Sequence, residues 1–104
     1  MQTTTVVFGR RIALTGRVDA TSAAAVRDAL HAAVLDGTGE LVVDMTGVDA
    51  LDAVGLGVLM GTHRLALGSD RSLVLDGCPP RIARLLRAIR LHRVLQLSGD
   101  AAAA

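Results

Sequence analysis

The sequence predicts a single α/β domain with a mixed sheet of four to five strands. Short runs of β-branched and aliphatic residues alternate with segments whose apolar residues recur at helical spacing. Two of these runs are continuously apolar, which is typical of strands buried on both faces of a sheet. The chain has 104 residues, enough for one core. We therefore expect one domain over residues 1–104, with fraying at 101–104.

The first two elements are predicted to be strands joined by a tight turn. Residues 3–8 are rich in β-branched side chains, and Ile12 and Leu14 alternate with other residues within 11–15. Gly9 and Arg10 lie between the two segments and are typical of a hairpin turn. The two strands should therefore be antiparallel.

An alanine-rich segment follows and predicts the first helix. Asp19 and Thr21 precede this segment, and either residue can cap a helix. Asp36 and Gly37 are typical of its end. The apolar residues at helical spacing are Val26, Leu30, Ala33 and Val34.

Strands and helices alternate through the rest of the chain. The continuous apolar runs at 41–45 and 72–75 predict two buried strands. Residues 54–67 predict a helix between them, and a Pro-Pro pair at 79–80 opens a third helix. The apolar stripe of the third helix is Ile82, Leu85, Leu86 and Ile89. Residues 94–97 predict a last strand, and the crossovers between parallel strands should be right-handed.

The composition argues against several classes of protein. No apolar run approaches the roughly 18 residues of a membrane span, and the N-terminal residues lack the pattern of a signal peptide. The lone Cys78 forms no internal disulfide and no cysteine cluster for a metal. We therefore expect a cytoplasmic protein that needs neither a membrane span nor a metal or other cofactor.

The charge of the chain is unevenly distributed although its net value is only +1. Five arginines face one aspartate in the last quarter, a balance of +4, while six arginines face nine acids elsewhere, a balance of −3. The five arginines are Arg81, Arg84, Arg87, Arg90 and Arg93. They form either a solvated helix face or a contact for an acidic partner. Nucleic acid is a poorer candidate because no aromatic residue interleaves the charges.

Catalytic and nucleotide-binding motifs are weak. The histidines His31, His63 and His92 belong to no recognisable triad motif, and we expect them to be solvated on the surface. The glycines at 55, 57 and 61 are similar to a dinucleotide-binding fingerprint, but their spacing is one residue too long. We interpret them as sites of close approach by a neighbour or partner. A small nucleotide-binding domain remains a remote alternative, and we expect no enzyme activity.

One segment resembles the STAS domain family, the anti-sigma factor antagonists. A strand ending in Asp44 leads through a short loop to Leu51-Asp52-Ala53-Val54-Gly55-Leu56-Gly57, where the family has Asp-Ser-x-Gly-Leu-Gly at a helix start. Residues 14–19 and 73–86 match other family segments in the same order, so the resemblance covers nearly the whole chain. One departure is Arg90, where the family usually has glycine. The resemblance implies a STAS-like domain with helices packed on one side of the sheet.

The same resemblance implies a protein-binding module. An antagonist of this family binds an anti-sigma factor with a kinase-like ATPase fold and thereby releases a sigma factor. The anti-sigma factor phosphorylates the serine after the aspartate, and the complex then dissociates. That position is Ala53 in this sequence, which has no oxygen to accept a phosphate. The chain is then an antagonist without this switch or, alternatively, a STAS subunit of an ABC-type lipid transport complex or a sensory assembly.

The resemblance also implies where the partner binds. The predicted partner-binding residues are Asp19, Thr21, Asp52, Ala53, Val54, Gly55, Leu56, Gly57 and Met60. Asp19 and Asp52 can cap helices as well, the two glycines permit close approach, and Leu56 is expected mainly in the core. Asp44 should bind loop amides. We expect a monomer or weak dimer that binds no nucleic acid.

Overall fold

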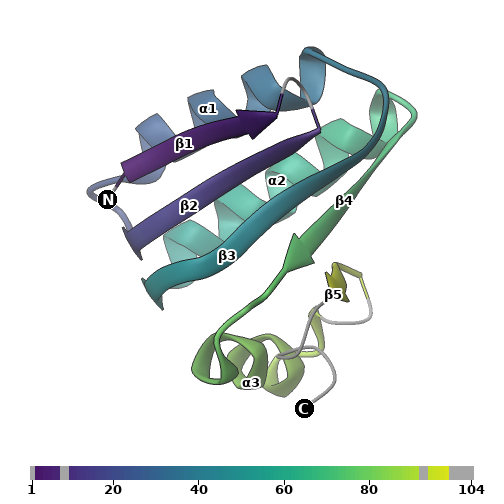
Figure 1. The fold of residues 1–104 in the computed structure, drawn as a ribbon. Helices are drawn as coiled ribbons and strands as arrows, with labels where there is room; N and C mark the ends of the chain where they lie inside the picture. The colour runs from purple at the N-terminus through teal and green to yellow at the C-terminus, as the bar shows by residue number, and fades with distance from the viewer. Residues whose placement is uncertain (1, 8–9, 92–93, 99–104) are drawn as a thin grey trace.

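Five strands form one mixed sheet in the order β1-β2-β3-β4-β5 (Figure 1). The computed structural model describes residues 2–7, 10–91 and 94–98. The strands are β1 (Gln2–Val7), β2 (Arg11–Val18), β3 (Gly39–Leu51), β4 (Arg71–Asp76) and β5 (Gln96–Ser98). β1 is antiparallel to β2, and every later neighbouring pair is parallel. The predicted mixed α/β sheet is thereby confirmed, although Phe8 and Gly9 of the expected hairpin lie outside the described residues.

Two of the three helices cover one face of this sheet. Helices α1 (Ala23–Leu35) and α2 (Ala53–Gly68) pack against each other and lie behind the strands in Figure 1. Helix α3 (Pro80–Ala88) follows β4 and lies at that end of the sheet. No helix of the described residues covers the opposite face of the sheet, where Val42 and Asp44 are half-buried.

An aliphatic core fills the space between the sheet and the two helices. In β3, Leu41, Val43 and Met45 point into the core and are fully buried, while the residues between them are half-buried. This alternation is the period-two pattern of a strand with one covered face. The four residues predicted for the inner face of α1 are all buried: Val26, Leu30, Ala33 and Val34.

The prediction that the third strand ends at Met45 is wrong, because β3 continues to Leu51. Residues 46–51 remain paired with β2, whose own strand also runs three residues beyond its predicted end. Two irregularities of register accommodate this extension. A Cβ at Gly47 would lie 2.8 Å from Thr15 Cγ2, so glycine permits the close pairing here. The glycine and aspartate residues that indicated a loop thus belong to a strand.

The outer part of the third helix also differs from expectation. Ile82 and Leu86 are buried as predicted, but Ile89 is 46% exposed because the helix ends at Ala88. Arg90 then adopts a φ of 63°, a left-handed conformation that favours glycine. This is the position where the family usually has glycine. A non-glycine residue pays about 1 kcal/mol there.

The histidines are not simply solvated, as the sequence suggested. His31 on α1 and His63 on α2 are half-buried. His31 Nε2 and His63 Nδ1 are buried and have no hydrogen-bond partner among the described residues. The packing of the two helices on each other and on the sheet covers part of their polar faces. His92 lies outside the described residues.

Arg71 is a buried cation that the sequence did not single out. It is 3% exposed, and its guanidinium donates hydrogen bonds to backbone oxygens around the end of α1 and the start of β3. The acceptors are the carbonyls of Ala33, Val34, Thr38, Gly39 and Glu40. Ala33 and Val34 belong to the last turn of α1, where a positive charge is favoured by the helix dipole.

Candidate partner-binding site

Two loops meet at the carboxyl ends of the adjacent parallel strands β2 and β3. The β2–α1 loop follows Val18 and the β3–α2 loop follows Leu51, and these two residues are partners in the strand register. The Ala20 amide donates to Asp52 Oδ2 over 3.3 Å and joins the loops. The structure therefore brings together the two predicted segments, which are more than 30 residues apart in sequence.

Asp52 begins helix α2 and fixes its position. Its Oδ1 accepts a hydrogen bond of 2.9 Å from the Gly55 amide, the capping geometry that the sequence predicted. Its own amide donates to the Val18 carbonyl over 3.3 Å. One exposed side chain thus caps a helix and links it to the neighbouring loop.

Asp19 organises the turn before α1, but it is not the N-cap residue. That position belongs to Ser22. Asp19 Oδ1 accepts hydrogen bonds from the amides of Thr21 and Ser22 over 3.0 and 3.2 Å, and Ser22 Oγ accepts one from the Asp19 amide over 3.1 Å. The prediction that Asp19 or Thr21 caps the helix directly is therefore wrong, because the N-cap lies three residues after Asp19 and one residue after Thr21. Thr21 itself is exposed.

Gly55 and Gly57 have different roles. Gly55 is buried, and a Cβ there would lie 2.3 Å from the Val18 carbonyl oxygen. Gly55 therefore lets α2 pack closely on β2, and it is not accessible to a partner. Gly57 is exposed, and a Cβ there would meet no described atom within 4 Å. At Gly61, one turn later, the first such atom is Arg64 Nη2 at 4.0 Å.

The remaining predicted residues divide between the surface and the core. Ala53 is exposed, and Val54 is 47% exposed. Leu56 and Met60 are half-buried against the core. This was expected for Leu56, whereas Met60 was expected to be exposed. Residues at i and i+4 share a helix face. The surface of α2 at this end is therefore a stripe of small and apolar residues, which we call the α2 stripe: Ala53, Val54, Gly57 and Gly61.

Arg17 is a residue of this region that sequence reasoning missed. It lines a shallow pocket beside the α1 start together with Asp19, Thr21, Ser22 and Ala25. Its side chain is 75% exposed, and its Nε lies 3.7 Å from Asp19 Oδ2. Its place at the end of β2, just before Asp19, is the only signal in the sequence. It adds a cation to the polar rim of the region.

The comparisons with known proteins agree with this architecture. A family model described as "Mlab, STAS domain" matches residues 7–99. This chain belongs to the STAS domain family. A search of curated proteins finds no match.

Solved structures share the fold of this STAS domain. An anti-sigma factor antagonist from Mycobacterium paratuberculosis is 27% identical with a TM-score of 0.76, over 86% of this chain and 76% of that one. The antagonist SpoIIAA in its unphosphorylated form is 17% identical with a TM-score of 0.74, over 98% and 90% of the two chains. A Thermotoga maritima protein is 15% identical with a TM-score of 0.78, over 92% and 84%.

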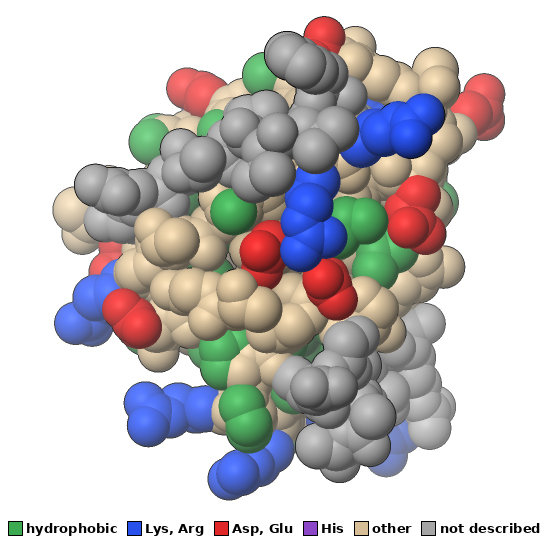
Figure 2. Space-filling view, in the orientation of Figure 1, with side chains coloured by type: hydrophobic (Ala, Val, Ile, Leu, Met, Phe, Trp, Pro, Cys, Tyr) green, Lys and Arg blue, Asp and Glu red, His purple; other side chains and the backbone are tan. Residues whose placement is uncertain are grey.

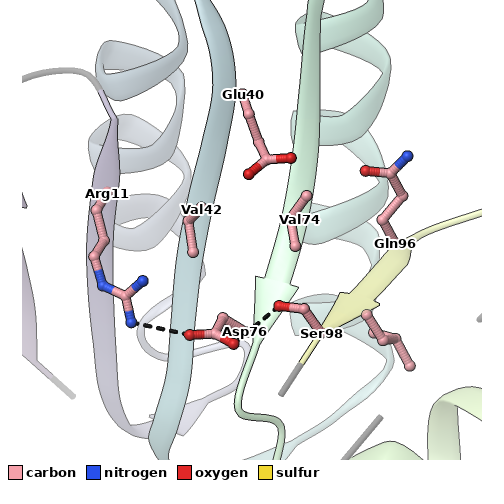
Figure 3. A pocket seen from close by; sticks show the side chains of 8 residues that line it. Arg11, Glu40, Val42, Val74, Asp76, Gln96 and Ser98 are labelled. Carbon is pink, nitrogen blue, oxygen red and sulfur yellow. Dashed lines mark hydrogen bonds and ion pairs between the residues drawn. The ribbon is translucent and has the colours of Figure 1, made fainter. Parts of the chain in front are cut away.

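The STAS domain also has a hollow on the open face of its sheet, and part of its lining is a network of ion pairs and hydrogen bonds (Figure 3). Arg11 Nη2 lies 3.3 Å from Asp44 Oδ2 and 3.1 Å from Asp76 Oδ2. Ser98 Oγ donates to Asp76 Oδ1 over 2.9 Å. These bonds connect β2, β3, β4 and the short β5, so we assign the network to sheet integrity.

Asp44 also binds Thr46, but the prediction that it stands at a strand end and binds loop amides is wrong, because both residues lie within β3. It accepts hydrogen bonds from the Thr46 amide over 3.0 Å and from the Thr46 hydroxyl over 2.7 Å. Partial burial raises the pKa of Asp44, but these hydrogen bonds and the Arg11 guanidinium together outweigh it and hold the pKa below its usual value.

The STAS domain offers little reactive chemistry in its described residues. They contain no group of three or more His, Cys, Asp or Glu side chains that could hold a metal ion. Cys78 is buried, and this burial, together with the nearby Asp76, raises the pKa of its thiol to about 11. No helix in the described ranges is long and apolar enough to cross a membrane.

The two glycines provide a matched pair of substitutions. Gly55→Ala should lower the free energy of unfolding by about 1–3 kcal/mol, because its Cβ would overlap Val18. Gly57→Ala should raise it by about 0.5–1 kcal/mol, because alanine is the better helix former and has room. Urea unfolding of both variants measures the difference. Equal effects of the two substitutions would contradict this assignment.

The Asp44 network predicts a specific acid sensitivity. A carboxyl group with a lowered pKa in the folded state stabilises the fold above its unfolded pKa of about 3.9, and this contribution is lost as the pH falls through the folded pKa. Asp44→Asn should therefore be less stable than the parent at neutral pH, with the gap closing between about pH 5 and 2. Chemical unfolding of both proteins across this pH range measures the difference in their free energies of unfolding. A difference that does not change with pH would exclude the charge effect.

Proposed function

We propose that this STAS domain is an anti-sigma factor antagonist that binds its partner through the α2 stripe. The observation that carries the proposal is Gly57. An exposed glycine inside a helix costs about 0.5–1 kcal/mol relative to alanine, and the described surroundings of Gly57 give no steric reason for it. Gly61, one turn later, is half-buried, and a Cβ there would meet no atom nearer than Arg64 Nη2 at 4.0 Å. A partner whose backbone packs closely on α2 would explain why glycine stands at position 57.

The chemistry of the surface fits protein binding. Ala53 and Val54 contribute exposed apolar area at the start of α2, and the two glycines leave the helix backbone accessible. Asp52 and Arg17 add charged groups at the edge. An apolar centre with a polar rim is the usual anatomy of a specific interface.

The proposed partner is an anti-sigma factor with a kinase-like ATPase fold. The similarity to structures of anti-sigma factor antagonists supports this choice. By occupying the anti-sigma factor, the domain would release a sigma factor in the cytoplasm. This role needs no catalytic group of its own.

The proposed antagonist lacks the phosphorylation switch at Ala53. The nearest hydroxyls in sequence are no substitutes. Thr62 is fully buried, and its hydroxyl donates to the Val58 carbonyl over 2.8 Å. The Thr46 hydroxyl is engaged by Asp44. The fraction of antagonist bound would then depend on the concentrations of the two proteins and not on phosphorylation at this position.

The second candidate is a subunit of an ABC-type lipid transport complex or of a sensory assembly. The matching family model is described as "Mlab, STAS domain". This description supports a second proposal, in which the α2 stripe binds a partner outside sigma-factor regulation. A pull-down from a lysate of the source organism separates the two candidates. The antagonist role predicts capture of a kinase-fold anti-sigma factor, and the transport role predicts capture of a transporter ATPase.

Ala53→Asp tests the location of the interface. A carboxylate at the exposed start of α2 is favoured by the helix dipole, so the melting temperature should stay within about 2 °C of the parent. It should weaken binding to the recombinant anti-sigma factor by about tenfold or more, because it places a desolvated charge in an apolar contact. Isothermal titration calorimetry measures the affinity.

Leu67→Asp is the matched control for this experiment. Leu67 lies near the other end of α2 and is 58% exposed, so the same change of charge there should leave the affinity unaltered. If the two variants weaken binding equally, or if Ala53→Asp leaves the affinity unchanged, the interface lies elsewhere.

A further inference from the structure

A groove separates the second half of β3 from the start of α3. Its lining comprises Thr46, Val48, Asp49, Pro79, Pro80, Arg81, Ile82 and Arg84. None of these residues belongs to the α2 stripe. One wall is the edge of β3, which can pair with an added strand, and the other is the basic helix α3, which can bind acidic side chains.

The strand wall is the edge of β3 beyond the point where β4 ends. β3 pairs with β4 only as far as Asp44, the partner of Asp76, and then continues to Leu51 with β2 on its other side. Gly77, with a φ of 69°, turns the chain from β4 toward α3. No described strand pairs with residues 45–51 on the β4 side. The Thr46 amide already donates to Asp44 Oδ1, and Gly77 packs against the Thr46 side chain, so the open stretch of this edge begins at Gly47. A free strand edge is a template for an added strand.

The helix wall carries uncompensated positive charge. Helix α3 contains three arginines and no acidic residue. Arg81 and Arg84 are exposed, and neither forms an ion pair with a residue in the described part of the chain. Asp49 is the only carboxylate in the lining, so the groove has a net charge of +1 from two arginines and one aspartate. Figure 2 shows basic side chains gathered at this α3 end of the molecule.

We propose that this groove binds an extended acidic segment of a partner protein. The segment adds as a strand to the free edge of β3, and its carboxylates pair with Arg81 and Arg84. Main-chain hydrogen bonds give such strand addition its affinity, and charge-assisted bonds to arginine fix the register. The site is independent of the proposed function, because it uses different residues and a different occupant chemistry.

The shape of the region argues against a membrane surface as the occupant. The apolar side chains of α3, Ile82 and Leu86, are buried inside the domain, so this helix has no apolar face to insert between lipids. Pro79 and Pro80 form a rigid wall, and proline has no amide hydrogen. Backbone donors for an extended peptide must therefore come mainly from β3.

An NMR titration of the ¹⁵N-labelled full chain tests the proposal. The probe is a synthetic peptide of alternating valine and glutamate. We expect saturable shifts of the amides of residues 47–50 and of the Arg81 and Arg84 side chains. The matched peptide with lysine in place of glutamate should not bind, and a peptide N-methylated at alternate residues should lose binding, because it cannot form the ladder.

Substitutions in the protein complete the test. The double variant Arg81→Gln/Arg84→Gln should weaken binding of the peptide by at least about tenfold, because it removes both charge-assisted contacts. Arg64→Gln, at an exposed position on α2, is the control and should change nothing; the amide spectrum shows that both variants are folded. The proposal is overturned if the lysine or N-methylated peptide binds equally well. It is also overturned if the shifts map elsewhere, or if anionic vesicles engage these arginines while the peptide does not.

Discussion

The candidate partner-binding surface depends on two hydrogen bonds that the Asp52 carboxylate accepts. One oxygen caps α2 through the Gly55 amide, and the other holds the Ala20 amide of the neighbouring loop. Gly55 then allows the first turn of α2 to rest against the Val18 carbonyl. A cap of this kind contributes about 1 kcal/mol. Its larger effect is positional, because it sets where Ala53, Val54 and Gly57 face solvent.

Local patterns in the sequence predicted most of the fold. The spacing of Val26 and Leu30 identified the buried face of α1, and continuous apolar runs identified the cores of β3 and β4. The extension of β3 to Leu51 was not predictable in this way. It depends on pairing with β2, a contact distant in sequence that overrides the loop preference of Gly47 and Asp49. Burial of Arg71 likewise depends on carbonyls that only the folded chain brings together.

The candidate site was predictable by motif but not in detail. The aspartates at 19 and 52 were identified from the family pattern, and the structure shows their loops joined. Gly55 and Gly57 look alike in sequence, and only the position of Val18 distinguishes a packing glycine from an exposed one. Arg17 and the strand wall of the groove beside α3 were missed because they arise from the ends of strands, which sequence reasoning places least well. Arg81 and Arg84, on the other wall, had been identified as a candidate contact for an acidic partner.

The central claim is that a protein partner docks on the α2 stripe. Amide hydrogen exchange of the STAS domain, free and in complex with the anti-sigma factor that it captures, tests this most directly. The account predicts slower exchange in the complex at residues 52–61 and in the adjoining loop at 19–22, with the C-terminal half of α1 unchanged. Protection confined to the open face of the sheet, with α2 unaffected, would contradict it.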